Sequence, residues 1–174
     1  MKNRLIILLC FIMCVSGSGC KWENADIKRG FREYERGDFD DAIWNFNYAL
    51  TKNSHSIEAY IGLAFSWEDK EDYDKAIEYY TKAIGIQNHI APYFFRGMIW
   101  AEKGEYAKAI DDYTRSLEFY PEASQIYINR AIAYFGKKDY DKCWADVHKA
   151  ESLGMNTDKF ILIPELKKVS GRER

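Results

Sequence analysis

Apolar residues recur along most of the chain at the three- and four-residue spacing of a single helix face. One such face lies within residues 73–84 and comprises Tyr73, Ala76, Ile77, Tyr80, Ala83 and Ile84. A second lies within residues 106–117 and comprises Tyr106, Ala109, Ile110, Tyr113 and Leu117. This spacing predicts amphipathic α-helices. Because the whole pattern returns about every 34 residues, it predicts a stack of similar helical units.

A short phrase marks the middle of each unit. It begins at Gly37, Glu71, Gly104 and Lys138. Glycine suits the C-terminus of a helix, and the aspartates that follow suit the N-terminal cap of the next one, namely Asp38, Asp72 and Asp139. Each unit is therefore predicted to hold two helices joined by a tight turn.

Small residues mark where the two helices of a unit cross. The first helices carry Gly30, Ala64, Gly97 and Ala131, and the second helices carry Ala42, Ala76, Ala109 and Cys143. Small side chains let helix axes approach to roughly 8 Å. These positions resemble the tetratricopeptide repeat, a helix-turn-helix unit, and Pro121 closes the third unit as that family's pattern expects.

The resemblance implies an all-α fold, an α-α superhelix or solenoid of about four repeats. Their expected bounds are residues 23–56, 57–89, 90–123 and 124–156. A capping helix interrupted by Pro164 is expected over 157–170, followed by a polar tail at 171–174. Because glycine disfavours a helix interior, the helix that contains Gly85 should end near Ile84 to Ile86. The first repeat has Asp26 where a large aromatic residue is usual, which is typical of a terminal repeat that departs from the family pattern.

The first twenty residues are typical of an export signal. Lys2 and Arg4 precede the apolar run Leu5–Val15, and small residues lead to Cys20. A helix of that run would be roughly 16 Å long, short of a bilayer core of about 30 Å. The segment resembles a bacterial lipoprotein signal, which implies a signal peptide at 1–19, a lipid on Cys20 and a short linker at 20–22.

The residue after the cysteine bears on location. Lys21 stands where aspartate favours retention at the inner membrane, so we expect an anchor in the outer membrane facing the periplasm. The alternative is ordinary cleavage near Ser18 or Gly19, which would release a soluble periplasmic or secreted protein.

Charge and motifs exclude several kinds of chemistry. Loss of Lys2 and Arg4 with the signal would take the formal charge from −2 to −4. No basic stripe, phosphate-binding loop, nucleophile motif or metal signature is found, so we expect no nucleic acid, no cofactor, no metal and no catalytic residues. Cys143 reads as a small buried residue, and the histidines as surface residues. Carboxylate runs such as Glu68 to Asp72 read as solvated helix ends.

The family's usual binding face is the concave surface formed by the first helices. In the family register, an apolar floor for a partner segment would comprise Ile27, Phe31, Tyr34, Ile61, Phe65, Phe94, Met98, Ile128, Ile132 and Phe135. An acidic lip beside it would comprise Glu35, Glu68, Asp69 and Glu102. The implied ligand is an amphipathic segment, apolar on one side and basic on the other. The alternative is that these residues are buried by packing.

Two further patterns concern charge inside the repeats. The residues that clamp an acidic chaperone terminus in related repeats are missing here. Arg96 and Arg130 match Asp112 and Asp146 in position, so these residues are expected to brace neighbouring helices, within one repeat or between two.

The sequence therefore predicts a non-catalytic scaffold of the bacterial envelope that binds a protein partner in its groove. Two alternatives stay open: an envelope glycan- or lipid-binding protein that uses the aromatic residues, and a self-assembling structural protein.

Overall fold

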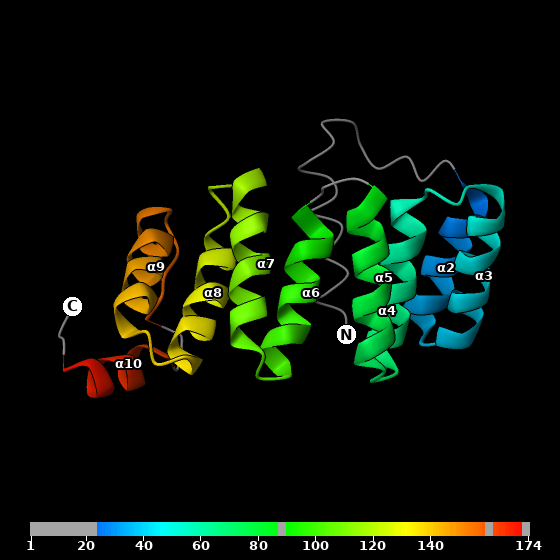
Figure 1. Ribbon diagram of the computed structural model, residues 1–174. Coiled ribbons are helices and arrows are strands. Elements are labelled where there is room, and N and C mark those ends of the chain that lie inside the picture. Colours follow the sequence, from blue (N-terminus) through cyan, green and yellow to red (C-terminus); the bar gives the residue numbers. More distant parts are fainter. Residues whose placement is uncertain (1–23, 87–89, 159–161, 172–174) are drawn as a thin grey trace. The chain divides into compact units, whose positions relative to one another are not determined.

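The structure is a computed structural model that describes residues 24–86, 90–158 and 162–171. Within these ranges the chain is built of α-helices joined by short turns, which confirms the all-α, helix-turn-helix fold (Figure 1). The helices are α2 (Ala25–Arg36), α3 (Phe39–Lys52), α4 (Ile57–Asp69), α5 (Tyr73–Ile86), α6 (Ile90–Glu102), α7 (Tyr106–Phe119), α8 (Ser124–Gly136), α9 (Tyr140–Ser152) and α10 (Leu162–Ser170). The expected signal peptide, Cys20, His89 and residues 172–174 lie outside the described residues.

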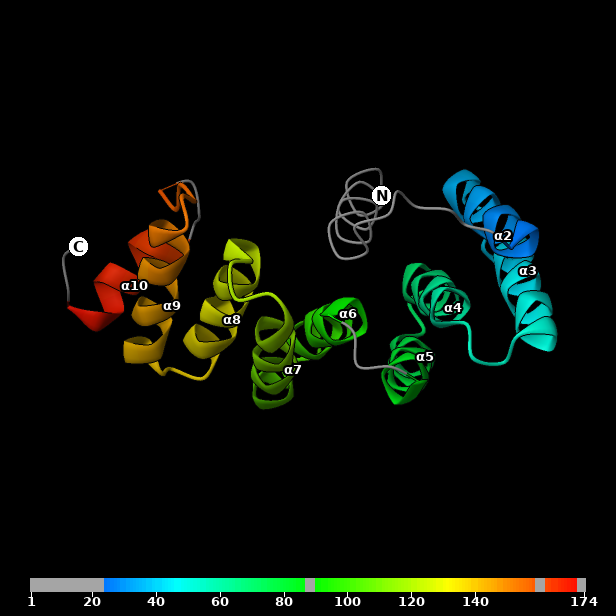
Figure 2. The same cartoon turned by 90° about the horizontal axis from the view of Figure 1, so that it is seen from above.

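The chain divides into two compact units, the first ending at Pro92 and the second beginning at Tyr93. In the first unit α2 packs on α3, α3 on α4, and α4 on α5. In the second unit α7 packs on α8, and α8 on α9. Figure 2 shows the α2–α3 pair and the α8–α9 pair each as adjacent helices. Each predicted repeat thus contributes one helix pair.

Close approach between helices centres on a large side chain in two of the repeats, Phe46 in the first and Tyr113 in the third. The ring of Phe46 in α3 is fully buried, and it faces Gly30 of α2 and Gly62 of α4. A Cβ added at Gly30 would lie 2.6 Å from Cε1 of Phe46, and the same ring also fills the space beside Gly62. In the second unit, a Cβ on Gly97 would lie 2.9 Å from Cε1 of Tyr113. Two of the small residues predicted at the crossings, Gly30 and Gly97, are therefore required by these rings.

The turns follow the predicted chemistry in part. Gly37 and Gly104 adopt left-handed backbone with φ of 87° and 74°. At the matching places of the other repeats, Glu71 and Lys138 take the same conformation with φ of 63° and 62°, which L-residues seldom adopt. In all four repeats the first helix therefore ends at a residue with left-handed backbone.

The predicted aspartate caps are also confirmed in part. The side chain of Asp72 accepts a hydrogen bond of 3.2 Å from the backbone N–H of Lys75, and that of Asp139 accepts one of 3.4 Å from Lys142. Asp38 precedes α3 without a capping hydrogen bond from its side chain. α5 ends at Ile86, as the position of Gly85 predicts.

The last helix covers one end of the second unit. Ile163 and Leu166 of α10 are buried in a cluster with Ile128, Ala131, Cys143, Trp144, Val147 and Ala150. The sequence places the start of this helix at residue 157 with a break at Pro164, and both details are wrong. Thr157 is not helical, and Pro164 lies in the first turn of α10, where a missing N–H costs nothing. Phe160 and Ile161, also expected in the cap, lie outside the described residues.

The crossing at Phe46 can be tested with two glycine substitutions. We expect Gly62→Ala to lower the free energy of unfolding by about 1–3 kcal/mol, because the new methyl group collides with the Phe46 ring. Gly85→Ala is the matched control, since nothing lies within 4 Å of its added Cβ. That change should stabilise the protein by up to about 1 kcal/mol. Urea unfolding of the full chain measures both, and equal effects of the two changes would contradict the crossing.

Candidate interaction surface

The predicted apolar floor is mostly buried. Six of its ten residues are at most 8% exposed: Ile27, Phe31, Ile61, Phe65, Phe94 and Ile128. A solvent-open floor at these six positions is therefore a wrong prediction, and the alternative of burial by packing holds there. Whether any of the ten residues contacts a partner stays a prediction.

Contacts inside each unit explain this burial. The rings of Phe31 and Phe46 meet edge to face with centroids 4.9 Å apart. Phe65 packs between Tyr34 and Tyr80, at centroid distances of 6.0 and 6.1 Å. The aromatic residues of the first helices thus fill the space between helices and leave little of their surface to a ligand.

The second unit uses its predicted floor residues in the same way. Phe94 lies 5.2 Å from Phe95 and 6.1 Å from Tyr113, measured between ring centroids. Ile128 belongs to the cluster that α10 closes. Burial at these positions is a requirement of the core.

The remaining four floor residues retain accessible surface. Tyr34, Met98 and Phe135 are half-buried, and Ile132 of α8 is 42% exposed. Ile132 shares its side of α8 with Asn129 and Gln125, because positions three and seven residues apart lie on one helix face. The Gln125 amide donates a hydrogen bond of 3.1 Å to Oδ1 of Asn129. We call Gln125, Asn129, Ile132 and Phe135 the α8 face, an exposed aliphatic side chain beside amide groups and an aromatic edge.

The predicted acidic lip does not form a row of free carboxylates. Glu68 is 6% exposed and accepts a hydrogen bond of 3.1 Å from the Tyr80 hydroxyl. Asp69 accepts one from the Tyr34 hydroxyl. Glu35 and Glu102 are exposed. The lip is therefore a wrong prediction at Glu68, whose carboxylate helps to join α4 to α5.

The two predicted arginine–aspartate pairs form within repeats. Arg96 of α6 donates to both carboxylate oxygens of Asp112 in α7, at 2.8 and 2.7 Å. Arg130 of α8 donates to both oxygens of Asp146 in α9 at 2.8 Å, and also reaches Oγ1 of Thr114 in the preceding repeat at 3.0 Å. Burial raises the pKa of Asp112, and the Arg96 hydrogen bond opposes that change. These paired groups brace the helices, and removal of one partner should cost about 3–5 kcal/mol.

The reactive candidates have structural roles. Cys143 is fully buried, and burial raises the pKa of its thiol to about 12, so the nucleophilic thiolate is scarce at neutral pH. Hydrogen bonds with Lys75 and Lys142 lower the pKa values of Asp72 and Asp139, as expected for helix caps. His55 and His148 are exposed, and the His148 ring stacks on Trp144. In the part of the chain that the structure describes, no group of three His, Cys, Asp or Glu side chains is placed to hold a metal ion.

A search of the described helices for a membrane span finds none of sufficient length and apolarity.

Two exposed features escaped the sequence analysis. Trp44 and Tyr48 of α3 stack with centroids 5.3 Å apart, and Trp44 is 61% exposed. On α2, the basic residues Lys28, Arg29 and Arg32 all lie in solvent. Their spacing along one helix face was the available signal, and the prediction that the chain has no basic stripe overlooked it.

Comparisons with known proteins agree with this architecture. Family models described as tetratricopeptide repeat match residues 28–92 and 91–123. The crystal structure of MamA is 24% identical, with a TM-score of 0.71, over 78% of this chain and 80% of that one. The pilF structure of Pseudomonas aeruginosa is 21% identical, with a TM-score of 0.74, over 84% and 68% of the two chains. The MamA 41-end structure from Desulfovibrio magneticus RS-1 is 18% identical, with a TM-score of 0.68, over 75% and 76%. No curated protein matches the sequence.

The structural reading of Cys143 predicts a silent thiol. At pH 8 to 9, we expect iodoacetamide to modify Cys143 at least about a hundredfold more slowly in the native protein than in urea. Because folding raises the pKa of the Cys143 thiol, the contribution of this group to the free energy of unfolding is complete at pH values below the pKa of an ordinary thiol. It declines as pH rises from there towards 12. Mass spectrometry of the peptide that contains Cys143 measures the rate, and rapid native modification would contradict a core role.

Proposed function

Because the chain belongs to the tetratricopeptide repeat family, we propose that it is a non-catalytic scaffold of the bacterial cell envelope that holds a partner protein. Family membership supports protein binding in general. The observation that supports binding at the α8 face is that Ile132 is 42% exposed at a position that the family register assigns to the binding surface.

The chemistry of the α8 face defines what it can bind. Ile132 offers an aliphatic surface, and the half-buried Phe135 lies one turn further along α8, with its ring 5.8 Å from that of Tyr140. Gln125 and Asn129 provide amide donors and acceptors at the other side of Ile132. A partner segment would place an apolar side chain on Ile132 and a backbone or polar group on the amides.

The charge of the chain bears on the same partner. With Lys2 and Arg4 removed, the formal charge of −2 becomes −4. Electrostatic attraction to this negative charge would speed the association of a segment that also carries basic residues. We therefore propose an amphipathic partner segment, apolar on one side and basic on the other.

The envelope location is proposed from residues 1–20. The apolar run Leu5–Val15 and the small residues before Cys20 support export and lipid attachment at that cysteine. Two or three acyl chains would hold the protein firmly, since each buried CH₂ contributes about 0.8 kcal/mol. The scaffold would then present its partner at the membrane surface, facing the periplasm.

The α8 face is tested by Ile132→Glu. We expect partner binding to fall at least tenfold, about 1.4 kcal/mol, because a carboxylate replaces the central apolar contact. The partner is first captured in cells with a photo-reactive residue at Ile132, and the affinity of that protein is then measured for each variant. Capture of further copies of this chain would support the self-assembling structural protein. Stabilisation of the folded chain by an added glycan, with no protein captured, would support the glycan-binding protein.

The matched control is Val169→Glu, a substitution at another exposed aliphatic residue, 45% exposed, in α10. Both variants should unfold within about 0.5 kcal/mol of the parent, since both sites are on the surface. Equal binding by the two variants would contradict the proposed site.

The anchor is tested by Cys20→Ser. We expect the parent chain to incorporate labelled fatty acid and to sediment with membranes, and the variant to lose the label, because serine lacks the thiol that is acylated. Labelling of the variant, or an unlabelled parent, would contradict lipid attachment at Cys20.

A further inference from the structure

The solvent side of α2 is basic. Ala25, Lys28, Arg29, Arg32, Glu35 and Arg36 are all exposed, and their spacing places them on one arc of the helix. Ile27, Gly30 and Phe31 are buried on the opposite arc against the rest of the first unit. Glu35 is the single acidic residue of the exposed arc, beside four basic ones.

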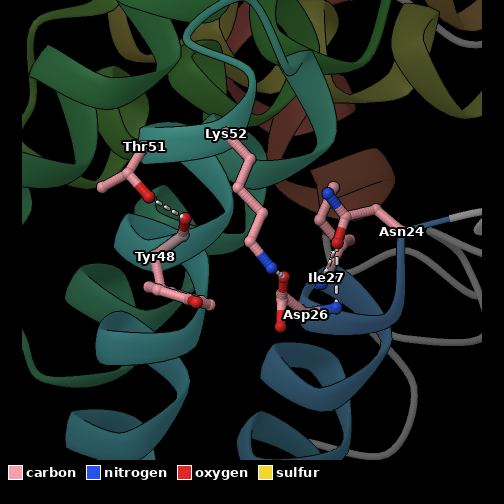
Figure 3. A network of polar contacts seen from close by, with 6 residues as sticks. All are labelled: Asn24, Asp26, Ile27, Tyr48, Thr51 and Lys52. Atoms are coloured by element: carbon pink, nitrogen blue, oxygen red, sulfur yellow. Dashed lines mark hydrogen bonds and ion pairs between the residues drawn. The ribbon is translucent and has the colours of Figure 1, made fainter.

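The acidic groups nearest this arc are already engaged. Lys52 at the end of α3 donates to Asp26 at the start of α2 at 2.7 Å, as Figure 3 shows. Glu33 pairs with Arg36 at 3.0 Å. Among the residues that the structure describes, none forms an ion pair with Lys28, Arg29 or Arg32. We call these three side chains the α2 basic face.

Two other helices pair exposed basic residues internally. In α5, Lys82 pairs with Glu78 at 2.6 Å, and in α7, Arg115 pairs with Glu118 at 3.1 Å. The three cations of the α2 basic face have no such pairs among the described residues, so their charge is not neutralised within the helix.

Comparison with the next repeat shows why this face is open. Residues 34 positions later are Gly62, Leu63 and Ser66 of α4, and all three are buried. Gly62 lies against the Phe46 ring of α3, so in α4 this side is covered by the preceding repeat. The matching side of α2 is in solvent, and it carries three cations.

Arg29 also lacks the role of its counterparts. Arg96 and Arg130 occupy the same repeat position and each binds an aspartate, whereas the first repeat has Asn45 at the aspartate position. The Asn45 amide donates instead to the backbone carbonyl of Asp41 at 2.8 Å. A bracing role does not explain Arg29.

We propose that the α2 basic face lies on a membrane surface of anionic lipid headgroups. The proposal rests on the lipid anchor proposed for Cys20. Only three residues lie between Cys20 and Asn24, which caps α2, so Asn24 is four Cα–Cα steps from Cys20. Four extended steps reach at most about 14 Å, so an anchor at Cys20 would hold the start of α2 close to the headgroups.

Charge and distance then decide the orientation. Basic side chains close to an anionic surface are attracted within a screening length of about 8–10 Å. Three such residues correspond to about a hundredfold preference for the surface-bound orientation. A helix of this length spans about 18 Å, so an anchor alone would bring its first turn near the membrane, and only a flat helix would bring its last turn there too.

The experiment therefore places a fluorescent amino acid at Glu35, in the last turn of α2. The full chain, processed in a bacterial host, is reconstituted in vesicles that carry a quencher on their headgroups. One vesicle type contains phosphatidylglycerol with phosphatidylethanolamine, and the other contains only phosphatidylcholine. We expect strong quenching with phosphatidylglycerol that falls at least about twofold with phosphatidylcholine or at high salt.

Two variants identify the residues responsible. Lys28→Gln with Arg29→Gln and Arg32→Gln should abolish the dependence on phosphatidylglycerol. Lys137→Gln with Lys142→Gln and Lys149→Gln removes the same charge from exposed positions of the second unit, and it should leave the quenching unchanged. Equal quenching in both vesicle types, or equal effects of the two variants, would overturn the proposal. So would loss of a captured protein without any change in quenching, which would assign the face to a protein partner.

Acylation is scored separately by mass spectrometry of the peptide that contains Cys20. An acylated chain whose Glu35 probe ignores lipid charge would overturn the α2 basic face alone. A chain without acyl groups that is still quenched only with phosphatidylglycerol would support the face and overturn the anchor. A chain without acyl groups that floats with neither vesicle type would overturn both.

Discussion

The packing of the first and third repeats depends on a large aromatic side chain seated against glycine in a neighbouring helix. Phe46 shows this most clearly, because its ring occupies the space beside both Gly30 and Gly62. Tyr113 takes the corresponding place against Gly97 in the second unit. The ring fixes the distance between helices, and a larger residue at either glycine would have to displace it. The close approach of the helices in these two repeats follows from this contact.

Sequence periodicity was sufficient for the helices and their pairing. The small residues at the crossings and the glycines of two turns carry local signals that need no tertiary context. Periodicity and residue type did not predict the backbone of Glu71 and Lys138, because both adopt a left-handed conformation without being glycine. Likewise, Asp72 caps a helix with its side chain and Asp38 does not, a difference that the residue type does not predict.

The binding surface could be predicted only in part, for a physical reason. A first helix packs on its own partner helix and on the preceding repeat, so its apolar arc is wide, and periodicity does not reveal which edge of that arc stays open. Phe65 and Ile132 both lie on that arc, yet Phe65 is 2% exposed and Ile132 is 42% exposed. The difference comes from Tyr34 and Tyr80, which enclose Phe65. Only the three-dimensional neighbours distinguish a core ring from a docking residue.

The same dependence on neighbours explains where charge is tolerated. In α4 the positions of Gly62, Leu63 and Ser66 are buried, so cations there would lose their hydration without compensation. In α2 the equivalent positions stay in water, and Lys28, Arg29 and Arg32 occupy them at no desolvation cost. Stability therefore permits these cations but does not select them. An anionic membrane close to the proposed anchor at Cys20 would give a reason for their presence.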